Sequence, residues 1–169
     1  MLKIFTSISQ LNTDQLLSVY KQSNSENGRR VYRELETTEQ IRLAEEAFLS
    51  YLREDFFAIH GSFCAVWVSD GAYKSVLRME PYKDGLLLTA LETAPEARRK
   101  GYAFALLTHS LEYAQTLGYK YIYSHVEKRN IASLGSHYKC GFRRVADSAV
   151  YIDGTVTQKS CTLRYEYGK

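Results

Sequence analysis

The middle of the sequence constrains the fold most, because it alternates a strand, a long helix and a second strand. Residues 86–93 (LLLTALET) are almost continuously apolar, which favours a buried strand, and Pro95 ends it. Apolar residues then recur at helical spacing as far as Leu117, and Gly118 stands where a helix stops. Residues 119–126 (YKYIYSHV) favour a second strand. This order predicts a strand-helix-strand crossover within a mixed α/β domain.

The flanking segments predict an antiparallel sheet and three more helices. The predicted strands are residues 2–8, a hairpin of 62–69 and 73–81 around Asp70-Gly71, and a last pair, 142–152 and 156–167, around Asp153-Gly154. The predicted helices are residues 12–22, capped near Thr13, residues 37–52, with Thr37 and Gln40 at capping-box spacing, and residues 130–140. The polar residues 21–36 are predicted to form a loop with a helical end.

Length and composition predict one soluble domain that spans residues 1–169. The chain is 45% hydrophobic and 24% charged, with a formal net charge of +3, and its basic residues are interleaved with acidic ones. A dedicated nucleic-acid binder would carry a concentrated basic face, so this class is disfavoured. No segment has the roughly 20 apolar residues that cross a membrane, and the N-terminus does not resemble a signal peptide.

The cysteines and histidines offer no metal or disulfide pattern. The three cysteines are scattered and include no CxxC pair, which predicts reduced thiols in a cytoplasmic protein. His60, His109 and His125 have no metal-like spacing, so each is expected to be hydrogen-bonded or exposed. We therefore expect no bound metal.

The turn EARRKGYA, residues 96–103, is the strongest candidate for a binding site. Arg98, Arg99 and Lys100 precede Gly101. Three interpretations are open: the cluster binds a nucleic-acid backbone, it assists a small phosphate group held by the main chain, or it is a solvated helix start that binds nothing. The first N–H groups of a helix have no internal partner and attract an anion. Gly101 lets the backbone approach a bulky group, and Ala103 keeps the next exposed position small. The spacing matches neither GxxxxGK[ST] nor GxGxxG, which disfavours a P-loop enzyme and a Rossmann domain.

Two motifs resemble those of the GNAT superfamily of acyl-CoA N-acyltransferases. Arg98-x-x-Gly101-x-Ala103 resembles the family's R/Q-x-x-G-x-G/A signature. Residues 130–142 (NIASLGSHYKCGF) resemble its N-x-x-[AS]…Y-x-K-x-G-F segment, through Asn130, Ser133, Lys139, Gly141 and Phe142. The likeness covers roughly residues 60–167. It implies a GNAT fold, with a central, mostly antiparallel sheet of six to seven strands, about four flanking helices, and a splay between two parallel middle strands.

The resemblance implies acetyl-CoA as co-substrate and direct transfer of the acetyl group to an amine. It places the pyrophosphate on the amides of Arg99 to Ala103 and the pantetheine arm along the preceding strand, near Leu91 and Thr93. The implied cofactor-binding residues are Leu91, Thr93, Arg98, Arg99, Lys100, Gly101, Tyr102, Ala103, Asn130 and Ser133.

Transfer to an amine requires a base, since the amine attacks only when neutral. Glu92 is our first candidate, because it lies on the donor strand near its splay, and Glu80 is the second. A solvated or salt-bridged carboxylate is the competing interpretation of each, and water is an alternative base. A main-chain N–H on the donor strand is the expected group to polarise the thioester carbonyl.

The acid that protonates the leaving thiolate is where the sequence departs from the family. The family tyrosine stands four residues before the glycine of G-F, and counting back from Gly141 gives His137 rather than Tyr138. One residue on a helix is about 100° of rotation, so the two side chains face different ways. Three alternatives stay open: His137, Tyr138 on a shifted helix, or solvent.

The acceptor is expected between the N-terminal helices, residues 21–36 and the far ends of the middle strands. The charges of residues 21–36 are mixed, so amines of small molecules and of proteins both stay open. The alternative function is a non-catalytic, CoA-binding GNAT-like sensor or scaffold. The resemblance also implies that a homodimer can form.

Overall fold

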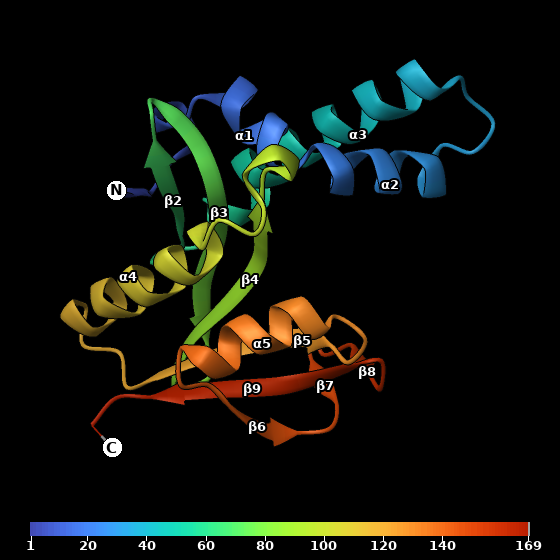
Figure 1. Ribbon diagram of the computed structural model, residues 1–169. Helices are drawn as coiled ribbons and strands as arrows, with labels where there is room; N and C mark the ends of the chain where they lie inside the picture. Colours follow the sequence, from blue (N-terminus) through green and yellow to red (C-terminus); the bar gives the residue numbers. More distant parts are fainter. Residues whose placement is uncertain (169) are drawn as a thin grey trace.

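The computed structural model describes residues 1–168 as a central sheet with helices on both faces (Figure 1). The sheet of this region has seven strands in the order β1-β2-β3-β4-β5-β9-β6, and only β4 and β5 are parallel neighbours. Its strands are β1 (Leu2–Phe5), β2 (Phe63–Ser69), β3 (Ala72–Tyr82), β4 (Gly85–Thr93), β5 (Tyr121–Glu127), β6 (Arg143–Ala146) and β9 (Ser160–Glu166). A separate hairpin pairs β7 (Ala149–Val150) with β8 (Val156–Thr157). These findings confirm the mixed, mostly antiparallel fold predicted above.

The helices divide between the two faces of the sheet. They are α1 (Thr13–Val19), α2 (Lys21–Val31), α3 (Thr37–Tyr51), α4 (Tyr102–Thr116) and α5 (Ile131–Lys139), with short turns η1 (Ile8–Gln10), η2 (Leu52–Phe56) and η3 (Pro95–Ala97). Helix α4 buries Leu106, Leu107 and Leu111 against one face. Residues of α1 and η2 pack on the other, against β2 and β3. Figure 1 shows α2 and α3 extending from the body as an antiparallel pair.

The parallel strands β4 and β5 stay together for only part of their length. Their paired residues are Leu86 with Ile122, Leu87 with Tyr123, and Leu88 with Ser124. Beyond Leu88, β4 turns away toward the N-terminal helices, and the sheet opens (Figure 1). The backbone groups along the open side of β4 therefore have no partner from β5, which leaves them free for a ligand.

Residues 21–36 differ from the predicted loop, since residues 21–31 form helix α2. Its turns are joined by side-chain hydrogen bonds such as that from Gln22 to Glu26, at 2.8 Å. It packs on α3 through Gly28, where an added Cβ would lie 2.5 Å from the carbonyl oxygen of Gln40. The buried residues of this helix are Asn24 and Gly28. The helix was missed because its packing face lacks the large apolar residues that reveal helical periodicity.

Three smaller predictions were also wrong. Helix α3 has Glu36 at its N-cap without a side-chain hydrogen bond, and Gln40 instead donates to the carbonyl of Leu35 at 2.7 Å, so no capping box forms. The predicted strand 142–152 is divided into β6 and β7, because the chain leaves the edge of the sheet. The hydroxyl of Tyr82 donates to the carbonyl of Val150 at 2.6 Å and holds the β7–β8 hairpin on β3. The predicted strand 156–167 is likewise divided into β8 and β9.

Candidate active site

The loop between β4 and α4 presents main-chain N–H groups at a helix start. Arg99 has a φ of 61° and Gly101 a φ of 82°, both in the left-handed region. Gly101 is the N-cap of α4, and within residues 1–168 the helix start has no side-chain cap, since glycine has no side chain to accept from the first amides. Left-handed residues beside a helix start turn successive amides toward one point, and that geometry binds anions. An added Cβ on Gly101 would meet no protein atom within 4 Å, so the space in front of the loop is open.

The basic side chains of this loop have different surroundings. The Nε of Arg98 donates to the carbonyl of Thr93 at 3.2 Å, which ties the loop to the end of β4. Arg99 and Lys100 are exposed to solvent. Arg98 therefore shapes the loop, whereas the other two supply positive charge at its surface.

A cleft of about 970 Å³ runs from this loop along β4 to α2 and α5. Every predicted cofactor-binding residue except Lys100 lines it, and so does Glu92. Glu80, His137 and Tyr138 do not. The lining residues that the sequence did not reveal are Gln22, Ser23, Glu26, Ala97, Phe104, Ala132, Ser136 and Lys139. At the α5 end of the cleft, Asn130 accepts a hydrogen bond from the amide of Ser133 at 3.0 Å, so it caps that helix.

Strand β4 bulges where it leaves β5. The pairing of β3 with β4 shifts between Val76 and Arg78, and Ala90 in the bulge has a φ of 51°. The hydroxyl of the buried Tyr20 donates to the carbonyl of Ala90 at 2.8 Å. Because a non-glycine residue in this region is strained, the hydrogen bond from Tyr20 stabilises an otherwise costly conformation. No pattern in the sequence predicts this contact, which joins residues 70 positions apart.

Glu92 is held against α2 at the edge of the cleft. Its carboxylate accepts a hydrogen bond from the hydroxyl of Ser23. Burial raises the pKa of Glu92, although the Ser23 hydrogen bond and the charge of Arg98 act in the opposite direction. A carboxyl group with a raised pKa accepts a proton more readily than an ordinary one, which is the property required of a base.

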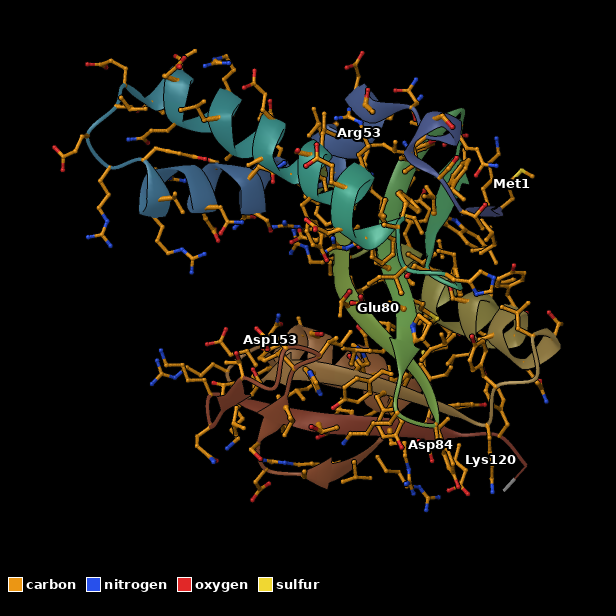
Figure 2. The ribbon with its side chains drawn as sticks, turned by 180° about the vertical axis from the view of Figure 1, so that it is seen from behind. Met1, Arg53, Glu80, Asp84, Lys120 and Asp153 are labelled. Carbon is orange, nitrogen blue, oxygen red and sulfur yellow. The ribbon has the colours of Figure 1, made fainter. Side chains whose placement is uncertain are left out.

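Glu80 lies near the C-terminal end of β3, and Figure 2 shows it between η2, which carries Arg53, and the loop of the β7–β8 hairpin, which carries Asp153. It is buried, and burial raises its pKa against a weaker lowering by Arg78. The guanidinium of Arg78 makes cation–π contacts with three rings. It lies 5.8, 5.1 and 5.4 Å from the centroids of Phe48, Tyr51 and Phe56.

His137 and Tyr138 have opposite environments on α5. His137 is 1% exposed, and its Nδ1 lies 2.8 Å from the carbonyl of Ser133. Since a carbonyl only accepts, Nδ1 carries the proton, and the unpartnered Nε2 of the neutral ring is an acceptor. Burial lowers the pKa of His137, which favours that neutral form. Tyr138 is 46% exposed and does not line the cleft.

The sequence of residues 29–142 matches the family model described as Acetyltransferase (GNAT) family. The chain belongs to this family. Among curated proteins no sequence matches this GNAT acetyltransferase, so solved structures provide the remaining comparisons.

Several solved structures share the fold of this GNAT acetyltransferase over nearly its whole length. PaiA N-acetyltransferase from Thermoplasma acidophilum, in complex with coenzyme A, is 16% identical with a TM-score of 0.63, and 99% of each chain is covered. The ribosomal-protein-S18-alanine N-acetyltransferase from Escherichia coli is 16% identical with a TM-score of 0.61, covering 100% of this chain and 96% of its own. Aminoglycoside 6'-acetyltransferase type Ii is 13% identical with a TM-score of 0.64, covering 98% and 96%. At these identities the likeness establishes the fold.

Residues 1–168 of this GNAT acetyltransferase contain neither a metal-binding cluster nor a membrane-spanning helix. No group of three or more histidine, cysteine, aspartate or glutamate residues is arranged to hold a metal there. In the same region, no helix has both the length and the apolar character needed to span a bilayer.

Lowering the pH below about 6.5 is expected to destabilise the fold partly through His137. Its pKa is lowered from the ordinary 6.5 in the folded state, so the unfolded chain binds more protons just below that pH. The free energy of unfolding then falls with the pH, by at most about 1.4 kcal/mol per pH unit for one group. Urea denaturation of the wild type and His137→Phe from pH 5 to 8 measures this contribution as the difference in slope. Equal slopes would contradict it.

Proposed function

We propose that the protein transfers an acetyl group from acetyl-CoA directly to a primary amine of a small molecule or a protein. The observation that carries the proposal is the cleft, where an uncapped helix start, a left-handed glycine and the open side of β4 lie on one continuous surface. A pyrophosphate needs the first two features, and an extended arm with amide groups needs the third.

The residues of the cleft fit CoA in chemical terms. The amides of residues 99–103 would hold the pyrophosphate, with the charge of Arg99 and Lys100 nearby. Leu91 and Thr93 would pair through their main chains with the pantetheine arm, and Asn130 and Ser133 would lie near the far end of that arm. The bound donor supplies an acetyl group activated as a thioester.

The proton transfers are divided between a carboxylate of this chain and solvent. We propose Glu92 as the base, because it lines the cleft and burial raises its pKa, and we retain Glu80 as the second candidate. A main-chain N–H of β4 near its bulge would polarise the thioester carbonyl. For the leaving thiolate we favour solvent as the acid over His137 and Tyr138. Neutral His137 has no proton on Nε2, and Tyr138 does not line the cleft.

The acceptor is assigned only as an amine. The structural neighbours are named for different acceptors, which include an alanine of ribosomal protein S18 and an aminoglycoside. The acceptor therefore varies among chains with this fold, and both small-molecule and protein amines remain within the proposal. We also propose a cytoplasmic location, because Cys64, Cys140 and Cys161 are free thiols. We further propose that the chain can form homodimers.

Thiol release from acetyl-CoA across a panel of amines is expected to identify at least one acceptor. The panel should include polyamines, amino acids, aminoglycosides and peptides with a free N-terminus or lysine, because these amines differ in size and charge. A thiol-reactive dye follows the CoA product, and mass spectrometry of the acceptor should show one added acetyl group. Calorimetric binding of acetyl-CoA without transfer to any amine would instead favour the CoA-binding sensor or scaffold.

A further inference from the structure

A histidine on β5 stands where the sheet opens and has no hydrogen-bond partner in residues 1–168. The last parallel pair is Leu88 with Ser124, and His125 is the next residue of β5. Both ring nitrogens of His125 are buried without a partner, contrary to the expectation that it would be hydrogen-bonded or exposed. Buried polar atoms in folded proteins are nearly always hydrogen-bonded, so unpartnered nitrogens at an opening indicate a place for a ligand.

His125 lies on the face of the sheet opposite α4. Glu80 pairs with Leu87, and Leu87 pairs with Tyr123, so these three side chains share one face. His125 is two residues beyond Tyr123 and therefore shares it too. The leucines of α4 pack on the other face, with Leu88. His125 does not line the 970 Å³ cleft described above, so an acceptor amine would reach its ring from the Glu80 side of the sheet, which α4 does not cover.

The surroundings of His125 hold its ring in place. Beyond the opening, β5 still pairs with β9, where Thr162 lies opposite His125. The ring packs edge-on against Tyr82, at 5.6 Å, and against Tyr151 of the hairpin, at 5.1 Å. The titratable and charged groups near it are these two tyrosines and Lys83, with Glu80 of β3 and Arg164 of β9 on the same face of the sheet. Burial, and to a lesser extent the charge of Lys83, lowers the pKa of His125, so the ring is neutral at neutral pH.

We propose that His125 binds the incoming amine of the acceptor and takes its first proton. The inference rests on the proposed acetyl transfer and adds a catalytic residue to it. An alkylammonium gives one proton to a ring nitrogen of His125, which becomes an imidazolium and leaves a neutral amine. The nitrogen lone pair then forms the C–N bond, and the C–S bond of the thioester breaks. The second nitrogen proton passes to the base proposed above, and solvent protonates the thiolate, so one proton is released in total.

Substitution of His125 by Gln and by Asn is expected to lower kcat/KM for an alkylamine at pH 7 by about 100-fold, as for loss of a general base. The two amides imitate the hydrogen bonding of Nε2 and Nδ1 but do not accept a proton in this range. In the wild type, one limb of the pH profile of kcat/KM should reflect the titration of His125. That limb should be absent from the profiles of both variants. Amines of low pKa, which are already neutral at pH 7, should show a much smaller defect. The Kd of acetyl-CoA by calorimetry should stay within about twofold, which also verifies the fold.

His109→Gln is the matched control, because His109 lies on α4 and its Nδ1 lies 2.9 Å from the carbonyl of Ala105. It should retain the activity and pH profile of the wild type. Unchanged kcat/KM in both His125 variants, or an equal defect for amines of high and low pKa, would overturn the role of His125 while leaving acetyl transfer standing. Absence of transfer by the wild-type protein, despite acetyl-CoA binding, would contradict the proposed function and this inference with it.

Discussion

Replacement of Gly101 by glutamate is expected to weaken CoA binding at least about 100-fold, the equivalent of about 2.7 kcal/mol. The new side chain would enter the open space in front of the loop, where the pyrophosphate is proposed to lie, and its negative charge would repel that group. The left-handed φ of 82° adds a conformational cost of about 1–2 kcal/mol to the folded state. Isothermal titration calorimetry with CoA measures the affinity directly.

Gly71→Glu is the control for backbone strain, because Gly71 also has a left-handed φ, of 72°, and no protein atom within 4 Å of an added Cβ. It lies in the β2–β3 turn, outside the cleft, and should lose similar stability while binding CoA normally. Arg99→Ala should weaken CoA binding less than Gly101→Glu, since the main chain defines the site. Unchanged affinity in Gly101→Glu would contradict the cofactor assignment. A larger loss in Arg99→Ala would favour a site built from side chains.

Replacement of Gly85 by alanine is expected to reduce the free energy of unfolding by roughly 3 kcal/mol, at the upper end of the usual cost of overpacking. An added Cβ would lie 2.1 Å from the carbonyl oxygen of Tyr121 and 2.8 Å from its carbonyl carbon. Both atoms belong to the backbone of β5, so no side chain can move aside to relieve the clash. Gly85 begins β4 at the closed end of the parallel pair, and strand separation there would spread to the opening. Thermal denaturation should show a Tm about 6–12 °C lower.

Gly135→Ala provides the contrasting change at a glycine without close neighbours. Gly135 lies within α5, its added Cβ would meet nothing within 4 Å, and its φ is not left-handed. Alanine is the better helix former by about 0.8–1 kcal/mol, so this variant should be slightly more stable than the wild type. Equal stability of Gly85→Ala and the wild type would show that β4 and β5 are not packed as closely as described.

Most of the residues of the β4–α4 turn that line the cleft could be identified from the sequence, because they are close together in it. Residues 98–103 form one turn at one helix start, so their local pattern offered main-chain anion binding as one of three alternatives, and the resemblance to the GNAT superfamily favoured it. The contacts around the proposed acceptor site could not be predicted in this way. Ser23 meets Glu92, Tyr20 meets the bulge at Ala90, and His125 meets Tyr82 only after the sheet and helices have assembled.

Local sequence patterns were enough to predict the crossover between β4 and β5, the glycine turn before α4, and most of the strands and helices around them. These features depend on hydrophobic periodicity and on the conformations open to glycine, which are properties of neighbouring residues. The tertiary structure alone decided that residues 21–31 are helical, that Glu92 is held by Ser23, and that His137 is buried as a neutral ring. It also decided that His125 stands unpartnered at the opening. The burial of a polar group and its hydrogen-bond partners depend on which distant segments of the chain surround it. Only folding brings those segments together.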